Sequence, residues 1–167
     1  SAAWKQLSAA DPSAVVVILA GMNEANELAA NWLRSAVETI VSRQSAAGGQ
    51  LPVKELTRFL EDTRHNPRAR RLAFDLIRRQ DPALADSLLA GMANDPSLEL
   101  RREAVQRVID SAKTALDAGD RTKAAPLYRQ ALGSARDLDQ IDLVSKQLKE
   151  LGESVDLAAL FGWISKW

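Results

Sequence analysis

The feature that most constrains this chain is a helical pattern that occurs three times. An arginine is followed by alanine two residues later and by apolar residues three and six residues later. The copies begin at Arg34, Arg71 and Arg102, so they lie 37 and 31 residues apart. Repeats of this length are units that cannot bury an apolar face alone and must stack on their neighbours. The pattern therefore predicts an all-α solenoid, with residues 1–167 as a single helical-repeat domain.

Composition supports a folded domain and excludes several classes of function. Of the 167 residues 46% are hydrophobic, which is ample material for a core. Lysine plus arginine and aspartate plus glutamate both number 22, so no bulk charge attracts nucleic acid or an anionic membrane. The absence of cysteine excludes disulfides and thiolate chemistry. The longest apolar run, 14–20, is far shorter than the ~20 residues that span a bilayer.

Regular punctuation predicts about nine helices. Asp11, Asn66, Asp81 and Asp95 each precede a proline, a pair that caps a helix and starts its first turn. The β-branched run 15–18 would favour a strand, but no second run exists to pair with it, so we predict a helix there. Apolar spacing then predicts helices over 12–22, 24–45, 52–63, 67–79, 82–93, 97–118 and 138–151. In the second of these, Leu28 and Trp32 are expected in the buried stripe with Ala36, Val37, Ile40 and Val41.

A second pattern begins inside the helix over 97–118. Gly119 and Tyr128 are nine residues apart, and Gly152 and Phe161 repeat this spacing 33 residues later. Small residues at 112, 124 and 131 would let two antiparallel helices pack closely, with the glycine forming the turn. The second copy is degenerate, since Leu157 and Ile164 stand where Ala124 and Ala131 would. Close packing of its second helix is therefore in doubt.

Both patterns resemble known repeat families. Residues of about 13–110, especially 95–105, resemble HEAT repeats, and about 97–164 resemble tetratricopeptide repeats. The resemblance implies helix pairs with a small residue, Ala104, at one crossing. It also implies structural roles for Arg71 and Arg102, because the arginine at this position of HEAT repeats commonly bonds an acidic residue of the neighbouring turn. The helix over 97–118 would belong to both kinds of repeat.

Residues that could carry catalysis are scarce. His65 is the only histidine, which excludes a Ser/His/Asp site and a paired-histidine zinc site within this segment. We expect it to be an exposed residue of a turn. Asp137, Asp139 and Asp142 lack the glycine and distal glutamate of a calcium loop, so we expect them to cap and charge a helix. We predict no catalytic, cofactor or metal site.

The sharpest local anomaly is a cluster of six arginines between positions 64 and 79, opposed by Asp75 alone. Arginine suits bidentate contact with phosphate, so Arg64, Arg68, Arg71 and Arg79 are candidate anion contacts. The competing interpretation is a face of ion pairs, because Asp75 lies four residues from both Arg71 and Arg79. No aromatic residues are interleaved to stack on bases, so we do not expect nucleic acid as the main partner.

The C-terminal residues are unusually apolar. We expect Leu157, Leu160, Phe161 and Ile164 to pack inward, with Trp163 and Trp167 partly exposed as a partner interface. The chain starts at Ser1 without methionine and stops inside this aromatic stretch, so we expect a fragment of a larger multidomain protein. The predicted function is a non-catalytic scaffold that binds a protein partner or an adjacent domain. The alternative is a polyanion-binding module that uses the arginine face.

Overall fold

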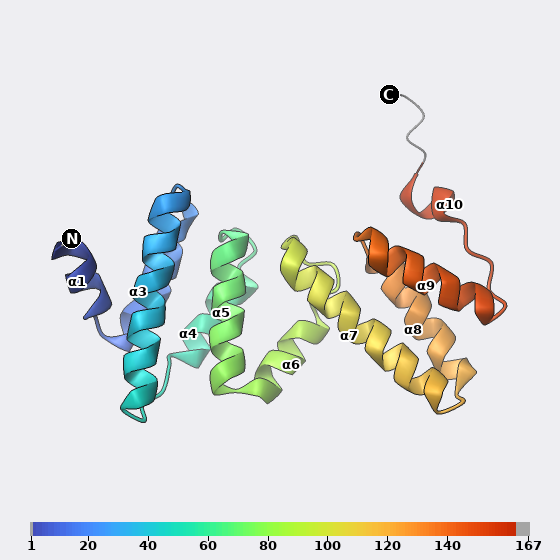
Figure 1. The fold of residues 1–167 in the computed structure, drawn as a ribbon, viewed down its shortest axis with the longest axis horizontal. Helices are drawn as coiled ribbons and strands as arrows, with labels where there is room; N and C mark the ends of the chain where they lie inside the picture. Colours follow the sequence, from blue (N-terminus) through green and yellow to red (C-terminus); the bar gives the residue numbers. More distant parts are fainter. Residues whose placement is uncertain (1, 163–167) are drawn as a thin grey trace. The chain divides into compact units, whose positions relative to one another are not determined.

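The computed structural model describes residues 2–162 and is helical throughout, with no strand in that range (Figure 1). Ten α-helices and two short 3-10 turns form there, against the nine helices expected. The short N-terminal helix α1 (Ala2–Ser8) was not among the ranges predicted from apolar spacing. The chain divides into two compact units, Ser1–Leu88 and Leu89–Trp167. The arrangement of all the helices in one solenoid stays a prediction.

The first unit is built around α2, which packs against three other helices of the unit. After α1 its helices are α2 (Val15–Ala20), α3 (Glu27–Ala46), α4 (Val53–Glu61), α5 (Pro67–Gln80) and the first part of α6 (Pro82–Ala90). The β-branched run is helical as predicted. Val15, Ile18 and Leu19 are buried while Val17 is exposed, which is the alternation of a helix with one face in a core. Burial on α3, α4 and α5 thus selects helix over the strand preference of valine.

The capping residues act where the sequence places them. Asp11, Asn66 and Asp81 each accept a hydrogen bond from a backbone N–H of the turn that follows, at 2.9 Å. Asp95 accepts one from the Ser97 N–H at 2.7 Å, and α7 begins just beyond, at Leu98. Each satisfies a donor that the first helical turn leaves without an internal partner.

The predicted buried stripe of α3 is half wrong. Ala36, Val37, Ile40 and Val41 are buried, but Trp32 is 53% exposed and Leu28 is 69% exposed. Residues four apart are rotated by about 40° around a helix, so the series 28, 32, 36, 40 turns through about 120°. The first two members therefore leave the face that the last two bury.

The second unit has one core shared by three antiparallel helices, α7 (Leu98–Asp117), α8 (Arg121–Ser134) and α9 (Leu138–Glu150). The helix α7 packs along α8, and the predicted small residues lie at this contact. Ala112, Ala124 and Ala131 are all buried in the core, and the Tyr128 ring lies among them, 2% exposed. Side chains this small allow two helix backbones to approach closely, as the spacing predicted.

Gly119 and Gly152 end α7 and α9 with the same turn. Both glycines have a positive φ, 79° and 86°, which other residues rarely adopt. In each turn the residue after the glycine donates to a carbonyl five residues back, Asp120 to Ala115 and Glu153 to Leu148. This is the Schellman ending of a helix. The 33-residue spacing thus reproduces the turn.

The helices that follow the two turns differ. The 14-residue helix α8 begins directly after Gly119, whereas α10 (Leu157–Phe161) has five residues and begins five positions after Gly152. Phe161 is 39% exposed where its counterpart Tyr128 is buried, and Leu160 is exposed as well. The expectation that Leu160 and Phe161 pack inward is therefore wrong. Leu157 is half-buried against the core.

The leucine at position 157 gives the physical reason. An alanine at the matching position, Ala124, lets α8 lie close to α7, and the larger side chain occupies that space before a second helix can. Trp163, Ile164 and Trp167, the rest of the predicted terminal cluster, lie outside the described residues, so their exposure stays a prediction.

The close contact of α7 with α8 predicts the effect of overpacking. Replacing Ala112 by leucine inserts three carbons where no space is left, and should lower the free energy of unfolding by about 1–3 kcal/mol. Urea denaturation followed by circular dichroism measures the loss. The control is Lys113→Leu, which adds the same residue on the exposed side of α7. Equal stability of Ala112→Leu and the wild type would contradict close packing at this crossing.

Candidate functional site

The predicted anion contacts of the first unit are largely paired with carboxylates of the chain itself. Arg64 grips Asp62 through two nitrogens, at 2.8 and 2.7 Å. These bonds hold the pKa of Asp62 well below its usual range and raise the pKa of Arg64. Arg71 pairs with Asp75 at 3.1 Å, and the exposed Arg68 lies 3.8 Å from Glu27.

Arg79 is the exception among the four. It is exposed and has no ion-pair partner among the described residues. The structure therefore places Arg68, Arg71 and Arg79 on α5, as predicted, with Arg64 in the turn before it. Two of the four guanidinium groups, those of Arg64 and Arg71, are directly bonded to carboxylates and are poorly available to phosphate.

The two other arginines of α5 that contact its core are structural. Arg70 is fully buried, and its Nε donates to the Leu60 carbonyl of α4 at 2.7 Å. The Arg78 guanidinium lies 4.4 Å from the centre of the Phe74 ring, within the range of a cation–π contact. Arginine at these positions thus fixes α5 against α4 and covers a buried ring.

His65 is not the exposed turn residue expected. Its ring stacks on Phe59 with centroids 3.9 Å apart, and its Nδ1 accepts a hydrogen bond from the Asn23 side chain at 3.0 Å. The Asn23 amide can only donate to the ring, because its oxygen accepts from the Asn66 N–H at 2.8 Å. The imidazole therefore joins the turn before α5 to the turn before α3, and one of its two nitrogens is already engaged.

Arg102 in the second unit contacts the acidic turn before α9. Its two terminal nitrogens bond to Asp139 at 2.9 and 2.5 Å, and one lies 3.2 Å from Asp137. The Arg102 guanidinium lowers the pKa of Asp139, which in turn raises the pKa of Arg102. Gln140 adds a bond from its side chain to the Arg102 carbonyl at 3.0 Å. Arginine and aspartates thus join α7 to the start of α9.

Asp142, the third aspartate of this run, does not take part in that contact. It is exposed one turn further along α9. Nowhere in residues 2–162 do three or more histidine, cysteine or acidic side chains converge as they would around a metal ion.

Leu28 and Trp32 form an exposed apolar pair, here called the α3 patch. They lie four residues apart and so occupy one side of the helix. The short helix α1 does not cover them. Arg43 donates to the carbonyls of Ser8 and Ala10 and so fixes the end of α1 near the end of α3. Seven helical residues extend about 10 Å from there, whereas Trp32 lies about 16 Å along α3 from Arg43.

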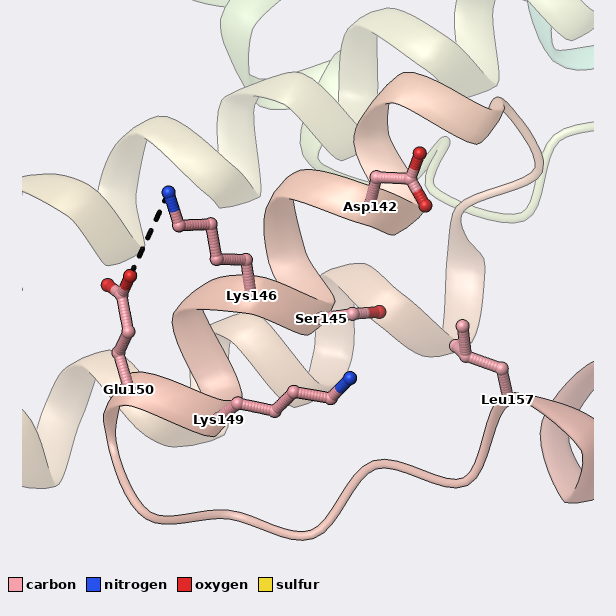
Figure 2. Close-up of a pocket in the computed structure, with 6 residues that line it drawn as sticks. All are labelled: Asp142, Ser145, Lys146, Lys149, Glu150 and Leu157. Carbon is pink, nitrogen blue, oxygen red and sulfur yellow. Dashed lines mark ion pairs between the residues drawn. The ribbon is translucent and has the colours of Figure 1, made fainter.

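A groove of about 450 Å³ lies beside α9 in the second unit (Figure 2). It is lined by Asp142, Ser145, Lys146, Lys149 and Glu150 from α9 and by Leu157 from α10. The Ser145 hydroxyl points toward Leu157, and the Lys149 side chain extends on that side of the helix. Lys146 and Glu150 pair with each other at 3.9 Å, away from Leu157.

Two members of this groove lack partners among the described residues. The Ser145 side chain is 5% exposed, yet its Oγ has no hydrogen-bond partner. Lys149 is exposed and has no carboxylate within ion-pair distance. A buried hydroxyl without a bond costs free energy that a ligand can recover, so the groove is the most chemically specific feature of the surface described.

Comparison with known proteins gives no relative. A scan against protein-family models found no match, and searches of curated proteins and of solved structures found none either. No helix in the described part of the chain is both long and apolar enough to cross a membrane.

Neither surface could be found by sequence reasoning. Trp32 reads as a core residue because its i+4 neighbours are apolar, and only the packing of α2 and α1 decides which face of α3 is covered. Ser145 and Lys149 have no distinctive spacing. The degenerate second hairpin was the one available signal for the groove, since it marks where a second helix fails to close on α9.

The pairing of the arginines predicts weak binding to polyanions. Because the chain has zero net charge and two of the four guanidinium groups are bonded to carboxylates, heparin binding should be detectable only below physiological salt. Fluorescence anisotropy with labelled heparin at increasing salt measures this. The control for Arg68→Gln, Arg71→Gln and Arg79→Gln is Lys5→Gln, Lys113→Gln and Lys123→Gln. Tight binding at about 0.15 M salt that only the arginine variant abolishes would refute the prediction.

The contact between Arg102 and Asp139 predicts a pH-dependent stability. The folded-state pKa of Asp139 is below the usual 3.8, so its contribution is complete above that value and is lost as the pH falls through the lowered pKa. Asp139→Asn should therefore unfold at lower urea than the wild type at pH 7. The gap should close in acid. Asp142→Asn, which removes a carboxylate without an ion-pair partner, is the control, and a gap that stays constant with pH would contradict the assignment.

Proposed function

We propose that this chain is a non-catalytic helical-repeat scaffold that binds a protein partner or an adjacent domain. The observation that carries the proposal is the α3 patch, in which a tryptophan and a leucine one turn apart are both more than half exposed. Tryptophan is enriched among the residues that dominate protein interfaces, since it combines a large apolar area with few rotamers. A side chain of this size gains most when a partner covers it.

The proposal includes one continuous solenoid, HEAT-like over about 13–110 and tetratricopeptide-like over about 97–164. Three features support the repeats. Helix pairs recur at matching positions, Ala104 is buried in α7, and the turns at Gly119 and Gly152 have the same hydrogen bonds. Arg102 contacts the acidic turn before α9, which is the role that the HEAT resemblance implies for it.

A binding role suits the chemistry better than catalysis. The chain has no cysteine and one histidine, and that histidine accepts a hydrogen bond from Asn23 while it stacks on Phe59. Stacked helix pairs present long surfaces to large partners and concentrate few reactive groups. Trp163 and Trp167 stay proposed partner contacts on the sequence argument alone. Polyanion binding is the weaker candidate, because carboxylates already engage Arg64 and Arg71.

Site-specific crosslinking tests the proposed function. A photoreactive residue at Asn31, which is exposed beside Trp32, should form a discrete crosslinked product with one partner in the cells that produce the chain. Leu28→Ser with Trp32→Ser should abolish the product, because truncation of an interface tryptophan costs about 2 kcal/mol or more. The matched control, Val17→Ser, removes an exposed apolar side chain elsewhere in the same unit.

The outcomes separate specific binding from general stickiness. A product that survives the double substitution, or that Val17→Ser removes equally, would contradict a binding role for the α3 patch. Crosslinks only to nucleic acid would favour the polyanion alternative. Thermal unfolding of each variant shows whether a lost product reflects a lost contact or a lost fold.

A further inference from the structure

The groove beside α9 lies where a closed helical hairpin would place its second helix. Shifting the first hairpin by 33 residues superimposes the turn at Gly119 on the turn at Gly152, and α7 on α9. In the first hairpin α8 lies along α7. In the second, α10 has five residues and leaves the corresponding face of α9 open, with Leu157 at its edge.

The chemistry of this face differs between the two hairpins. Ser145 corresponds to Ala112, which is buried in the core of the unit. Asp142 and Lys149 correspond to Ile109 and Leu116, both of which pack into that core. The α9 face thus carries an acid, a hydroxyl and a base where the α7 face carries apolar side chains. An apolar helix would leave all three groups without partners, so it does not suit the groove.

We propose that the groove binds a short extended peptide segment that carries one acidic and one basic side chain. This assignment rests on the proposed protein-binding function and names the chemistry of one partner segment. Lys149 and the Ser145 hydroxyl take the acidic side chain, and Asp142 takes the basic one. Leu157 contacts an apolar residue between them.

The dimensions set the length of the segment. Asp142 and Lys149 are seven residues apart on one side of α9, which is about 10 Å along the helix. An extended chain rises about 3.3 Å per residue, so acidic and basic residues about three positions apart match this spacing. The volume of about 450 Å³ lies within the range of pockets that hold ligands of this size.

The serine favours a ligand over an empty surface. Its Oγ is buried without a partner, whereas Ser111 and Thr114 of α7 donate their hydroxyls to carbonyls four residues back, at 2.9 Å. Ser145 does not use that local solution. A carboxylate beside it would accept its proton and neutralise Lys149 at the same time, which makes both bonds stronger than neutral ones.

The test uses blocked tetrapeptides, acetyl-Glu-Ala-Leu-Lys-amide and the matched acetyl-Gln-Ala-Leu-Lys-amide, with the whole chain. Titration followed by amide NMR shifts should move resonances of α9, and the glutamate peptide should bind at least about threefold tighter than the glutamine peptide. Lys149→Ala should remove that preference. Lys113→Ala, its counterpart on the exposed side of α7, should leave it unchanged. Ser145→Ala should weaken binding without lowering the melting temperature.

Three results would overturn the site. They are unmoved α9 resonances at millimolar peptide, a glutamate preference that persists in Lys149→Ala, and binding that is insensitive to Ser145→Ala. Crosslinking at Asn31 separates this failure from that of the proposed function. If the groove is silent while the partner product depends on Trp32, the chain binds proteins through the α3 patch and the groove assignment alone falls.

Discussion

The second unit depends on the close approach of α7 and α8, which small side chains permit. Ala112, Ala124 and Ala131 are buried where the two helices meet, and Tyr128 fills the remaining space. Because packed interiors tolerate neither gaps nor excess volume, these few residues set how α8 lies on α7, and α9 then packs on α8. The turn at Gly119, with its positive φ, brings the two helices into register.

The same motif repeated with different side chains gives a different product. Leucine replaces alanine at 157, and charged residues replace apolar ones at 142 and 149, so the turn at Gly152 forms without a closed hairpin behind it. A groove with a lysine, an unbonded hydroxyl and an aspartate results. Degeneration of a repeat is thus the structural origin of its most specific surface, as expected where a packing position is released from the core.

Local signals predicted the helices well. The capping pairs and apolar spacing placed α2 to α9 within a few residues of their ends, since each rests on backbone chemistry close in sequence. Exposure was harder. Leu28, Trp32, Leu160 and Phe161 all read as apolar helix residues, and their exposure depends on which neighbouring helix covers them. His65 was misread because its partners, Asn23 and Phe59, come from other parts of the chain.

The central claim is that the first hairpin of the second unit is closed and its repeat is open. Hydrogen–deuterium exchange, resolved by residue across α8 and α10, tests it most directly. Amides of α8 should exchange only through cooperative unfolding of the unit, and so as slowly as those of α7. Amides of α10 should exchange orders of magnitude faster, through local opening. Equal protection of α8 and α10 would show that the second hairpin is closed as well, and would contradict the account.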